Sequence, residues 1–295
     1  MKVASENLGC KTRAAFQLPR LLTHAAGRTA NSESTKVPFP LSGVERLDVG
    51  GRVPKLPPGT RIYTIGDIHG RLDLLKELER QIDQDIKSRP IGRPLYVFLG
   101  DYIDRGMSSR QTIDWLIEHS RNCETVFLMG NHEQIAIECL RNPDLFGQWM
   151  RLGGLETLIS YGIVPEATGS VGKKIVEMQA AFHTALPQSH LRFFRNLQSC
   201  FSCGDFFFAH AGINPDVDLS RQKERDLLWI RSAFLSSDKN FGKIIIHGHT
   251  PTHDIEVRPN RVNIDTGAFA TGRLTCLVID EESLSVIDVC RANGG

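Results

Sequence analysis

Three apolar segments of this 295-residue chain each end at a glycine that is followed by polar residues. The segments are rich in β-branched and aromatic residues, which is typical of β-strands that stop at a turn. The segments and the stretches that follow them are 61–65 with GDIHG at 66–70, 95–99 with GDYIDRG at 100–106, and 125–129 with GNHE at 130–133. Because parallel strands present their carboxyl ends at one edge of a sheet, the three polar stretches are expected to lie together.

Helices are expected between these strands. Apolar residues recur at three- and four-residue steps from Leu72 to about Ser88, which predicts an amphipathic helix. A second helix is expected over Gln111–His119, with Ser108 or Ser109 as its cap. The order strand–helix–strand–helix–strand indicates an α/β domain with parallel strands.

The rest of the chain divides into a helical middle, at about 133–200, and a strand-rich last third. Short turns separate many of the later strands, which favours antiparallel pairing. Two of these later strands end at histidines, in Ala209-His210-Ala-Gly212 and in His247-Gly-His249.

The polar residues after the five strands include carboxylates, an amide and imidazoles but no thiolate. A single fragment of this kind is commonly only a turn or a buried, hydrogen-bonded histidine. Five of them in order, each after a predicted strand, instead indicate a site for a hard-to-borderline divalent cation such as Mn, Fe, Zn or Mg.

The charge balance and the apolar runs exclude some classes of partner. Lys and Arg number 35 and Asp and Glu 34, which gives a formal net charge of +1. A chain without a global positive field is not expected to bind nucleic acid or an anionic membrane surface. The longest apolar runs have the length of a strand, so the sequence predicts no membrane span.

Seven cysteines and a distinct N-terminal segment bear on compartment and domain organisation. The odd number of cysteines and the absence of an apolar signal segment favour reduced thiols in a cytoplasmic protein. Cys200-Phe-Ser-Cys203 has the spacing of half a zinc ribbon or of a redox motif, which stays as an alternative.

Residues 1–58 are predicted to be a flexible tail and linker, although their basic character is also typical of an organellar transit peptide. Residues 59–295 are predicted to form one folded domain that carries these motifs.

The complete set GDIHG, GDYIDRG and GNHE resembles the signature of the calcineurin-like metallophosphoesterases, and within them the phosphoprotein phosphatases. The resemblance is closest to the bacterial and bacteriophage-type serine/threonine phosphatases and covers roughly 61–280. It also includes Trp149, Gly153-Gly154 and the stretch Asn263-Ile-Asp-Thr-Gly267. It implies an α/β (α+β) four-layer sandwich of two mixed sheets between helices. One departure is Met129, where the family commonly has an arginine.

The resemblance also implies a role for individual residues. Two divalent ions, with Mn as the first choice and Fe, Zn or Mg as alternatives, would share Asp101. The ligands of the first ion would also include Asp67 and His69, and those of the second Asn131, His210 and His249. A hydroxide bridging the metals would attack phosphorus in line. His132 would protonate the leaving group, with Asp104 orienting its ring, while Arg105 and Arg231 would bind the phosphate oxygens. Spacing alone leaves open whether His132 is an acid or a ligand.

The function implied by the resemblance is hydrolysis of a phosphate monoester, with phosphoserine or phosphothreonine in a phosphoprotein or phosphopeptide as the substrate. A symmetrical dinucleoside tetraphosphatase is the first alternative, although that group usually departs from the DRG and NHE forms present here. A catalytically inactive scaffold that binds phosphopeptides is the second alternative. Metal-dependent turnover would separate an enzyme from a scaffold.

Overall fold

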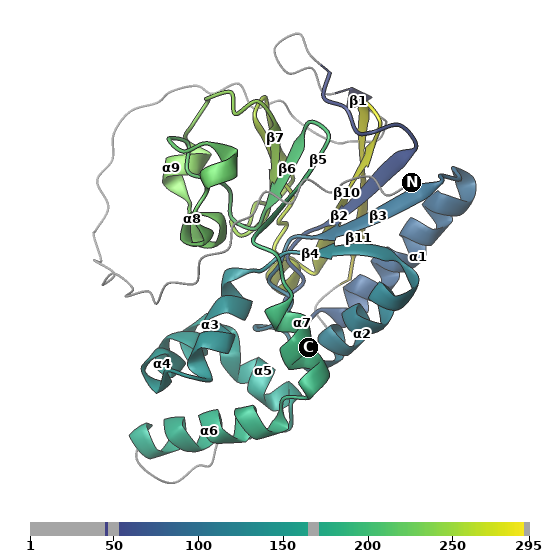
Figure 1. Ribbon diagram of the computed structural model, residues 1–295. Coiled ribbons are helices and arrows are strands. Elements are labelled where there is room, and N and C mark those ends of the chain that lie inside the picture. Colours follow the sequence, from purple (N-terminus) through teal and green to yellow (C-terminus); the bar gives the residue numbers. More distant parts are fainter. Residues whose placement is uncertain (1–44, 47–52, 165–170, 292–295) are drawn as a thin grey trace.

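The computed structural model describes residues 45–46, 53–164 and 171–291. Two β-sheets pack face to face, with helices on the outer face of each sheet (Figure 1). The first sheet has the strand order β1 (Glu45–Arg46), β11 (Ser283–Cys290), β10 (Arg273–Asp280), β2 (Thr60–Ile65), β3 (Arg93–Phe98), β4 (Glu124–Phe127). The second has the order β5 (Cys200–Cys203), β6 (Phe206–Ala209), β7 (Ile244–His247), β9 (Arg261–Asn263), β8 (Glu256–Arg258).

Each sheet combines parallel and antiparallel strands. In the first sheet β2, β3 and β4 are parallel, and β10 runs antiparallel to β2. In the second sheet β6, β7 and β9 are parallel, whereas β5 and β8 are antiparallel to their neighbours. Two mixed sheets were expected, but the antiparallel pairing predicted for the last third is wrong for β6, β7 and β9. The connections between these strands are long enough to cross over, so the strands can share one direction.

Helices complete the outer layers (Figure 1). Figure 1 shows α1 and α2 beside the first sheet, α8 and α9 beside the second, and α3–α7 together as a helical unit. The helices are α1 Leu72–Ser88, α2 Ser109–Asn122, α3 Asn131–Cys139, α4 Phe146–Trp149, α5 Leu155–Ser160, α6 Val171–Ala185, α7 Gln188–Arg195, α8 Glu224–Trp229, α9 Ser232–Leu235 and α10 Ala268–Thr271. Shorter turns are the 3₁₀ helices η1 Pro143–Leu145 and η3 Leu219–Arg221, and the π-helical turn η2 Met150–Gly154.

Alternation along the strands divides the core between the two faces of the first sheet. Ile62 of β2 packs between the sheets with Phe206 and Phe208, while Tyr63 and Ile65 face α1 and α2. The predicted helix α1 buries Leu74, Leu75, Leu78 and Ile82, as its period requires. Each such buried side chain contributes about 1.5–3 kcal/mol of transfer free energy. The predicted α/β sandwich is therefore confirmed at the level of its layers.

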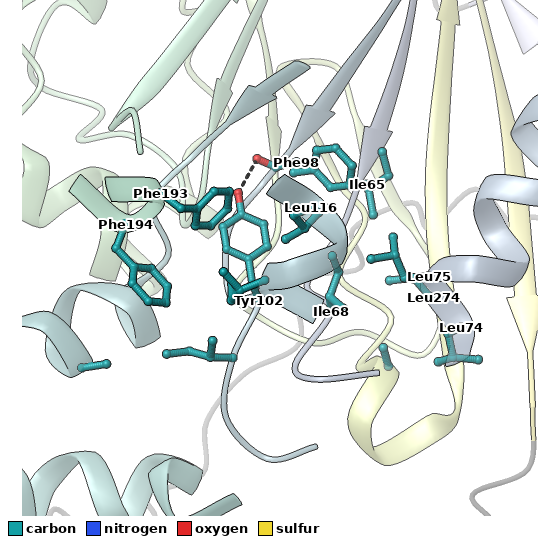
Figure 2. Packing of buried hydrophobic residues seen from close by; sticks show 14 of the residues in the cluster. Ile65, Ile68, Leu74, Leu75, Phe98, Tyr102, Leu116, Phe193, Phe194 and Leu274 are labelled. Carbon is teal, nitrogen blue, oxygen red and sulfur yellow. Dashed lines mark hydrogen bonds between the residues drawn. The ribbon is translucent and has the colours of Figure 1, made fainter. Parts of the chain in front are cut away.

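The apolar cluster beside α1 and α2 extends to the helical unit (Figure 2). Figure 2 shows Tyr102 between Phe193 and Leu116, with its hydroxyl directed at the Phe98 carbonyl. The Tyr102 hydroxyl donates to that carbonyl oxygen at 3.3 Å and to the Leu128 carbonyl oxygen at 2.7 Å. Because Tyr102 follows Asp101 directly, this packing fixes the loop that carries the proposed metal ligands.

Part of the predicted linker packs on the domain. Leu56 is buried among the residues between the sheets, and its backbone N–H donates to the Glu281 carbonyl oxygen at 3.1 Å. Glu45 and Arg46 pair with β11. Residues 53–58 are thus ordered against the sandwich, while the rest of the predicted tail before 45 and at 47–52 lies outside the described residues.

The Cys200–Cys203 motif forms strand β5. Cys200 packs with the apolar cluster under α8 and α9, whereas Cys203 packs with the cluster between the sheets. The two thiols therefore lie on opposite faces of the sheet and do not share a site.

Among the helices in the described part of the chain, none combines the length and the apolar character that crossing a membrane requires.

Candidate metal centre

The polar residues of interest follow the carboxyl ends of five parallel strands. Asp67 and His69 follow β2, Asp101 follows β3, and Asn131 begins α3 after β4. In the second sheet, His210 follows β6 and His249 follows β7. The edges of both sheets contribute to one place, as expected for ligand groups beyond the carboxyl ends of parallel strands.

These loops hold several functional side chains in left-handed backbone conformations. The φ angles are 46° at His69, 51° at Asp101, 72° at Asp104, 67° at Arg105 and 67° at His249. Residues other than glycine adopt such angles at a cost of about 1–3 kcal/mol each, and they do so mostly at functional sites. The surrounding hydrogen bonds must therefore compensate for this strain.

Close approach of the loops explains two of the glycines. A Cβ atom on Gly130 would lie 2.1 Å from Asp101 Oδ1, and one on Gly100 would lie 2.6 Å from the Gly130 backbone nitrogen. Either contact would force the GDYIDRG and GNHE loops apart. The glycines in these motifs are needed because the two loops touch at the backbone.

Two groups of possible metal ligands share Asp101. His69, Asp101 and His132 form one group, Asp101, His210 and His249 the other, and within each group the ligand atoms lie within 4.8 Å of one another. Asp101 Oδ2 lies 3.6 Å from His69 Nε2, while Asp101 Oδ1 lies 3.4 Å from His210 Nε2. A carboxylate that serves both groups is what a dinuclear site requires.

The hydrogen bonds of His69 and His210 leave Nε2 with a lone pair. Nδ1 of His69 donates to the Ile103 carbonyl oxygen at 2.8 Å, and Nδ1 of His210 donates to the Leu99 carbonyl oxygen at 3.0 Å. Burial is the main reason that the pKa of both imidazoles lies below the usual range, so both rings are neutral. A backbone carbonyl on the second nitrogen is the usual support of a metal-binding histidine.

Acceptor atoms crowd together around Asn131. Its Oδ1 lies 2.9 Å from His210 Nε2 and 2.8 Å from His249 Nδ1. Because His210 Nε2 has no proton to give, its lone pair faces a lone pair of Asn131 Oδ1 at 2.9 Å, a normal hydrogen-bonding distance. Nε2 of His249 is buried without a hydrogen-bond partner. A cation among these atoms would resolve the repulsion, so the residues fit a bound divalent metal.

Asp67 belongs to neither three-residue group, but its surroundings also favour a cation. Its Oδ2 accepts from the His249 backbone N–H at 3.1 Å, and its Oδ1 is buried without a partner. Burial, followed by repulsion from Asp265 and Asp101, raises the pKa of Asp67 well above its usual range. Asp265, which the sequence analysis did not assign to the site, has a pKa raised to about 6, mainly by burial.

Asp101 is the carboxylate that stays ionised. Burial opposes its charge, yet the pKa of Asp101 lies well below its usual range. Among its neighbours, His132 has a raised pKa of its own and also donates its backbone N–H to Asp101 Oδ1 at 3.1 Å. The ionised group lies between the two sets of imidazoles and provides the negative charge that both metal positions need.

His132 and Asp104 form a buried pair next to this centre. Nδ1 of His132 lies 2.7 Å from Asp104 Oδ2, and the two side chains are 1% and 0% exposed. Nε2 of His132 lies 3.7 Å from Asp101 Oδ2. The structure thus brings His132 close enough to be considered both as an acid and as a ligand.

Two arginines lie on different sides of the centre. Arg105 donates to His69 Nε2 at 3.0 Å and to His132 Nε2 at 3.1 Å, and its guanidinium carbon lies 4.5 Å from the centre of the Phe269 ring. Arg231 is exposed, and its charge contributes to the low pKa of His210 and His249, which places it near the second ligand group. Met129, at the family's usual arginine position, is half-buried.

Glu133, the last residue of GNHE, was given no role by the sequence analysis. Its two carboxylate oxygens accept from four backbone N–H groups, those of Asp101 (2.9 Å), Tyr102 (2.8 Å), Ile103 (3.2 Å) and Gly130 (3.0 Å). Burial and Asp101 raise the pKa of Glu133 to about 8. All four partners are nevertheless donors, so the bonding pattern is that of an ionised carboxylate that joins the two loops.

Replacing Glu133 with glutamine should therefore destabilise the fold. The new NH₂ group would face backbone N–H donors, and we expect the free energy of unfolding to fall by about 3 kcal/mol or more. Urea denaturation measures this change. Glu138→Gln, the same substitution on a half-buried position of α3, is the matched control and should cost less than about 1 kcal/mol. Equal losses in the two variants would contradict the bridging role of Glu133.

Comparisons with known proteins agree with this geometry. The model of the calcineurin-like phosphoesterase family matches residues 60–274. The chain is 29% identical to a bis(5'-nucleosyl)-tetraphosphatase PrpE of the asymmetrical type from Anoxybacillus flavithermus, over 75% of this chain and 92% of that protein. It is 30% identical to the protein of the same name from Bacillus thuringiensis, with the same coverage of both chains.

One solved structure shares the fold over most of its length. The crystal structure of a "putative diadenosine tetraphosphatase" superposes with a TM-score of 0.53 at 17% identity, over 81% of this chain and 97% of that one. The relatives named here are tetraphosphatases of the asymmetrical type, whereas the alternative predicted from the motifs was of the symmetrical type. With the family model covering most of the described domain and the candidate ligand residues at its strand ends, the chain belongs to the calcineurin-like phosphoesterases, a family of metal-dependent hydrolases.

Proposed function

We propose that the chain binds two divalent cations through the six residues identified from its motifs. Asp67, His69 and Asp101 would hold one ion; Asn131, His210 and His249 would hold the other together with Asp101. The observation that carries this proposal is the close approach of His210 Nε2, an acceptor, to the oxygens of Asn131 and Asp101. Mn is the first choice, and Fe, Zn and Mg also suit oxygen and imidazole donors.

When bound, two such ions supply positive charge that acidifies a water molecule and neutralises the phosphate. The protein side chains then have separate tasks. Arg105 can turn from the imidazoles toward the substrate and bind phosphate oxygens with paired N–H groups, and Arg231 can do so from the opposite side. His132, held by Asp104 through Nδ1–H, directs Nε2 toward the centre. In the imidazolium form, which carries a second proton on Nε2, it can give that proton to the leaving oxygen and return to the neutral ring.

For the substrate we propose a bis(5'-nucleosyl) tetraphosphate that is cleaved asymmetrically. The support is the similarity to proteins of that name over 92% of their length. Asymmetrical cleavage of a dinucleoside tetraphosphate yields a nucleoside triphosphate and a nucleoside monophosphate, whereas symmetrical cleavage yields two diphosphates.

Phosphoserine or phosphothreonine in a protein is a second candidate substrate, favoured by the buried His132–Asp104 pair. A serine leaving group is a strongly basic alkoxide and needs a proton, whereas a nucleotide leaves as a stable anion. A buried acid pair therefore accelerates the cleavage of alkyl phosphates more than the cleavage of nucleotide anhydrides. The cytoplasmic location and the absence of nucleic-acid or membrane partners stay predictions.

Product analysis tests the proposed substrate. With diadenosine tetraphosphate and Mn, Mg, Zn or no added metal, we expect metal-dependent formation of ATP and AMP in equal amounts, measured by ion-exchange chromatography. Phosphoserine peptides and free phosphoamino acids under the same conditions provide the competing arm. Formation of ADP alone would contradict asymmetrical cleavage, and turnover of the peptides alone would favour the second candidate.

A further inference from the structure

Two side chains of the helical unit reach the buried carboxylate of Asp104. Nε1–H of Trp149, at the end of α4, lies 3.1 Å from Asp104 Oδ1 and 3.0 Å from Oδ2. The hydroxyl of Thr157, on α5, donates to Oδ1 at 2.6 Å. The same hydroxyl oxygen accepts from the backbone N–H of Asp104 at 2.9 Å. Trp149 and Thr157 therefore bind both the side chain and the backbone of this residue.

These contacts determine how Asp104 can act. The carboxylate is 0% exposed, and His132, Trp149 and Thr157 are its hydrogen-bonding partners in the described part of the chain. The neighbouring Arg105 directs its guanidinium at His69 and His132 instead. Thr157 binds Oδ1 and the Trp149 N–H lies between the two oxygens, so Oδ2 stays directed at His132 Nδ1. This contact keeps a proton on Nδ1 and leaves Nε2 as the atom that carries the transferable proton toward the centre.

The backbone between the two side chains is shaped for this contact. The turn η2 contains Gly153 at φ 102°, and its carbonyl oxygen accepts from the Arg105 N–H at 3.0 Å. A Cβ atom on Gly153 would lie 2.8 Å from the Arg105 nitrogen, and one on Gly154 would lie 2.7 Å from the Trp149 ring. Single π-helical turns of this kind occur frequently at functional sites.

We propose that Trp149 and Thr157 are positioning residues for proton transfer, because they hold Asp104 at the angle that orients the His132 ring. This inference rests on the proposed role of His132 as the acid. The helical unit then has a function beyond packing, since it completes a site whose other residues come from the ends of the two sheets.

The competing explanation is packing alone. Trp149 is fully buried, and its ring lies 5.6 Å from that of Phe146 and 5.0 Å from that of Phe182. Loss of packing would lower stability and affect all substrates alike. Loss of orientation would instead affect a substrate in proportion to the basicity of its leaving group.

The test compares kcat on phenyl phosphate with kcat on 4-nitrophenyl phosphate, whose leaving group is far less basic. In the metal-loaded full-length protein, Thr157→Val and Trp149→Phe should lower kcat on phenyl phosphate by about 10- to 100-fold, and by less than about threefold on the nitrophenyl ester. Thr157→Ser keeps the hydroxyl and should restore the ratio of the two rates. Phe182→Leu, which disturbs the same ring without touching Asp104, is the packing control and should leave the ratio unchanged.

Two further measurements separate the possible outcomes. In a His132→Asn background, Thr157→Val should cause no additional change in the rate ratio, because the group it positions is absent. In the NMR spectrum of the metal-free protein, the deshielded Nδ1 proton of His132 should move in Thr157→Val but not in Phe182→Leu. If His132→Asn itself leaves the ratio unchanged, the proposed acid and this inference are both wrong. If His132→Asn changes the ratio but Thr157→Val and Trp149→Phe do not, only the positioning role is wrong.

Discussion

Asp101→Asn is expected to lose metal content and turnover together. Asp101 is the one residue common to the two candidate ligand groups, and it is a buried carboxylate whose pKa lies well below its usual range. Its replacement removes one negative charge from both metal positions. Substitution of a residue that only hydrogen-bonds to a metal ligand typically lowers metal affinity or activity 10- to 100-fold. For a shared ligand we therefore expect a loss of more than about 100-fold.

The measurement is metal content after gel filtration, together with the rate on a small phosphoester. Asp280→Asn is a suitable control, because it removes a partly buried carboxylate at the far end of the first sheet, where Asp280 pairs with Arg61 at 2.8 Å. This control should lower stability without changing the metal content. Two tightly held metals and near-normal turnover in Asp101→Asn would contradict the bridging assignment.

His132→Asn is expected to slow cleavage of alkyl phosphates by about 10²–10⁴-fold, the usual contribution of a positioned acid. The loss should be clearly smaller on 4-nitrophenyl phosphate, because a nitrophenolate leaves without a proton. Nδ1 of His132 is bound to Asp104 at 2.7 Å, so the ring has only Nε2 available for catalysis.

Metal analysis distinguishes the acid from a ligand. His132 also lies in the ligand group of His69 and Asp101, so metal coordination is a real competitor for Nε2. If His132 is the acid, His132→Asn should keep the metal content near that of the wild type. Equal losses on both ester types together with metal depletion would show that His132 is a ligand.

The strand ends and their motifs could be predicted because they depend on neighbours in the chain. Runs of β-branched and aromatic residues that end at a glycine marked β2, β3 and β4, and the three- to four-residue period marked α1 from Leu72 to Ser88. Parallel strands end at one edge, so the residues after them had to converge. The motif spacing therefore predicts the location of the candidate centre.

The partners of these residues could not be predicted in the same way. Thr157 lies 53 residues after Asp104 in the chain, and no local period or motif connects the two. Trp149 belonged to the recognised stretch, but its bond to Asp104 depends on how α4 packs against α3 and α6. The four backbone donors of Glu133 come from two loops whose contact exists only after folding.

By itself, the sequence determined the fold class, the order of the strand ends and the chemical types of the side chains that they carry. These properties follow from local periodicity and from the turn residues, which act over a few positions. The tertiary structure alone decided the parallel direction of β6, β7 and β9, the packing of Leu56, and the left-handed backbone at His69, Asp101 and Asp104. Each of these depends on contacts between segments far apart in the chain, where the surrounding packing and hydrogen bonds outweigh local preference.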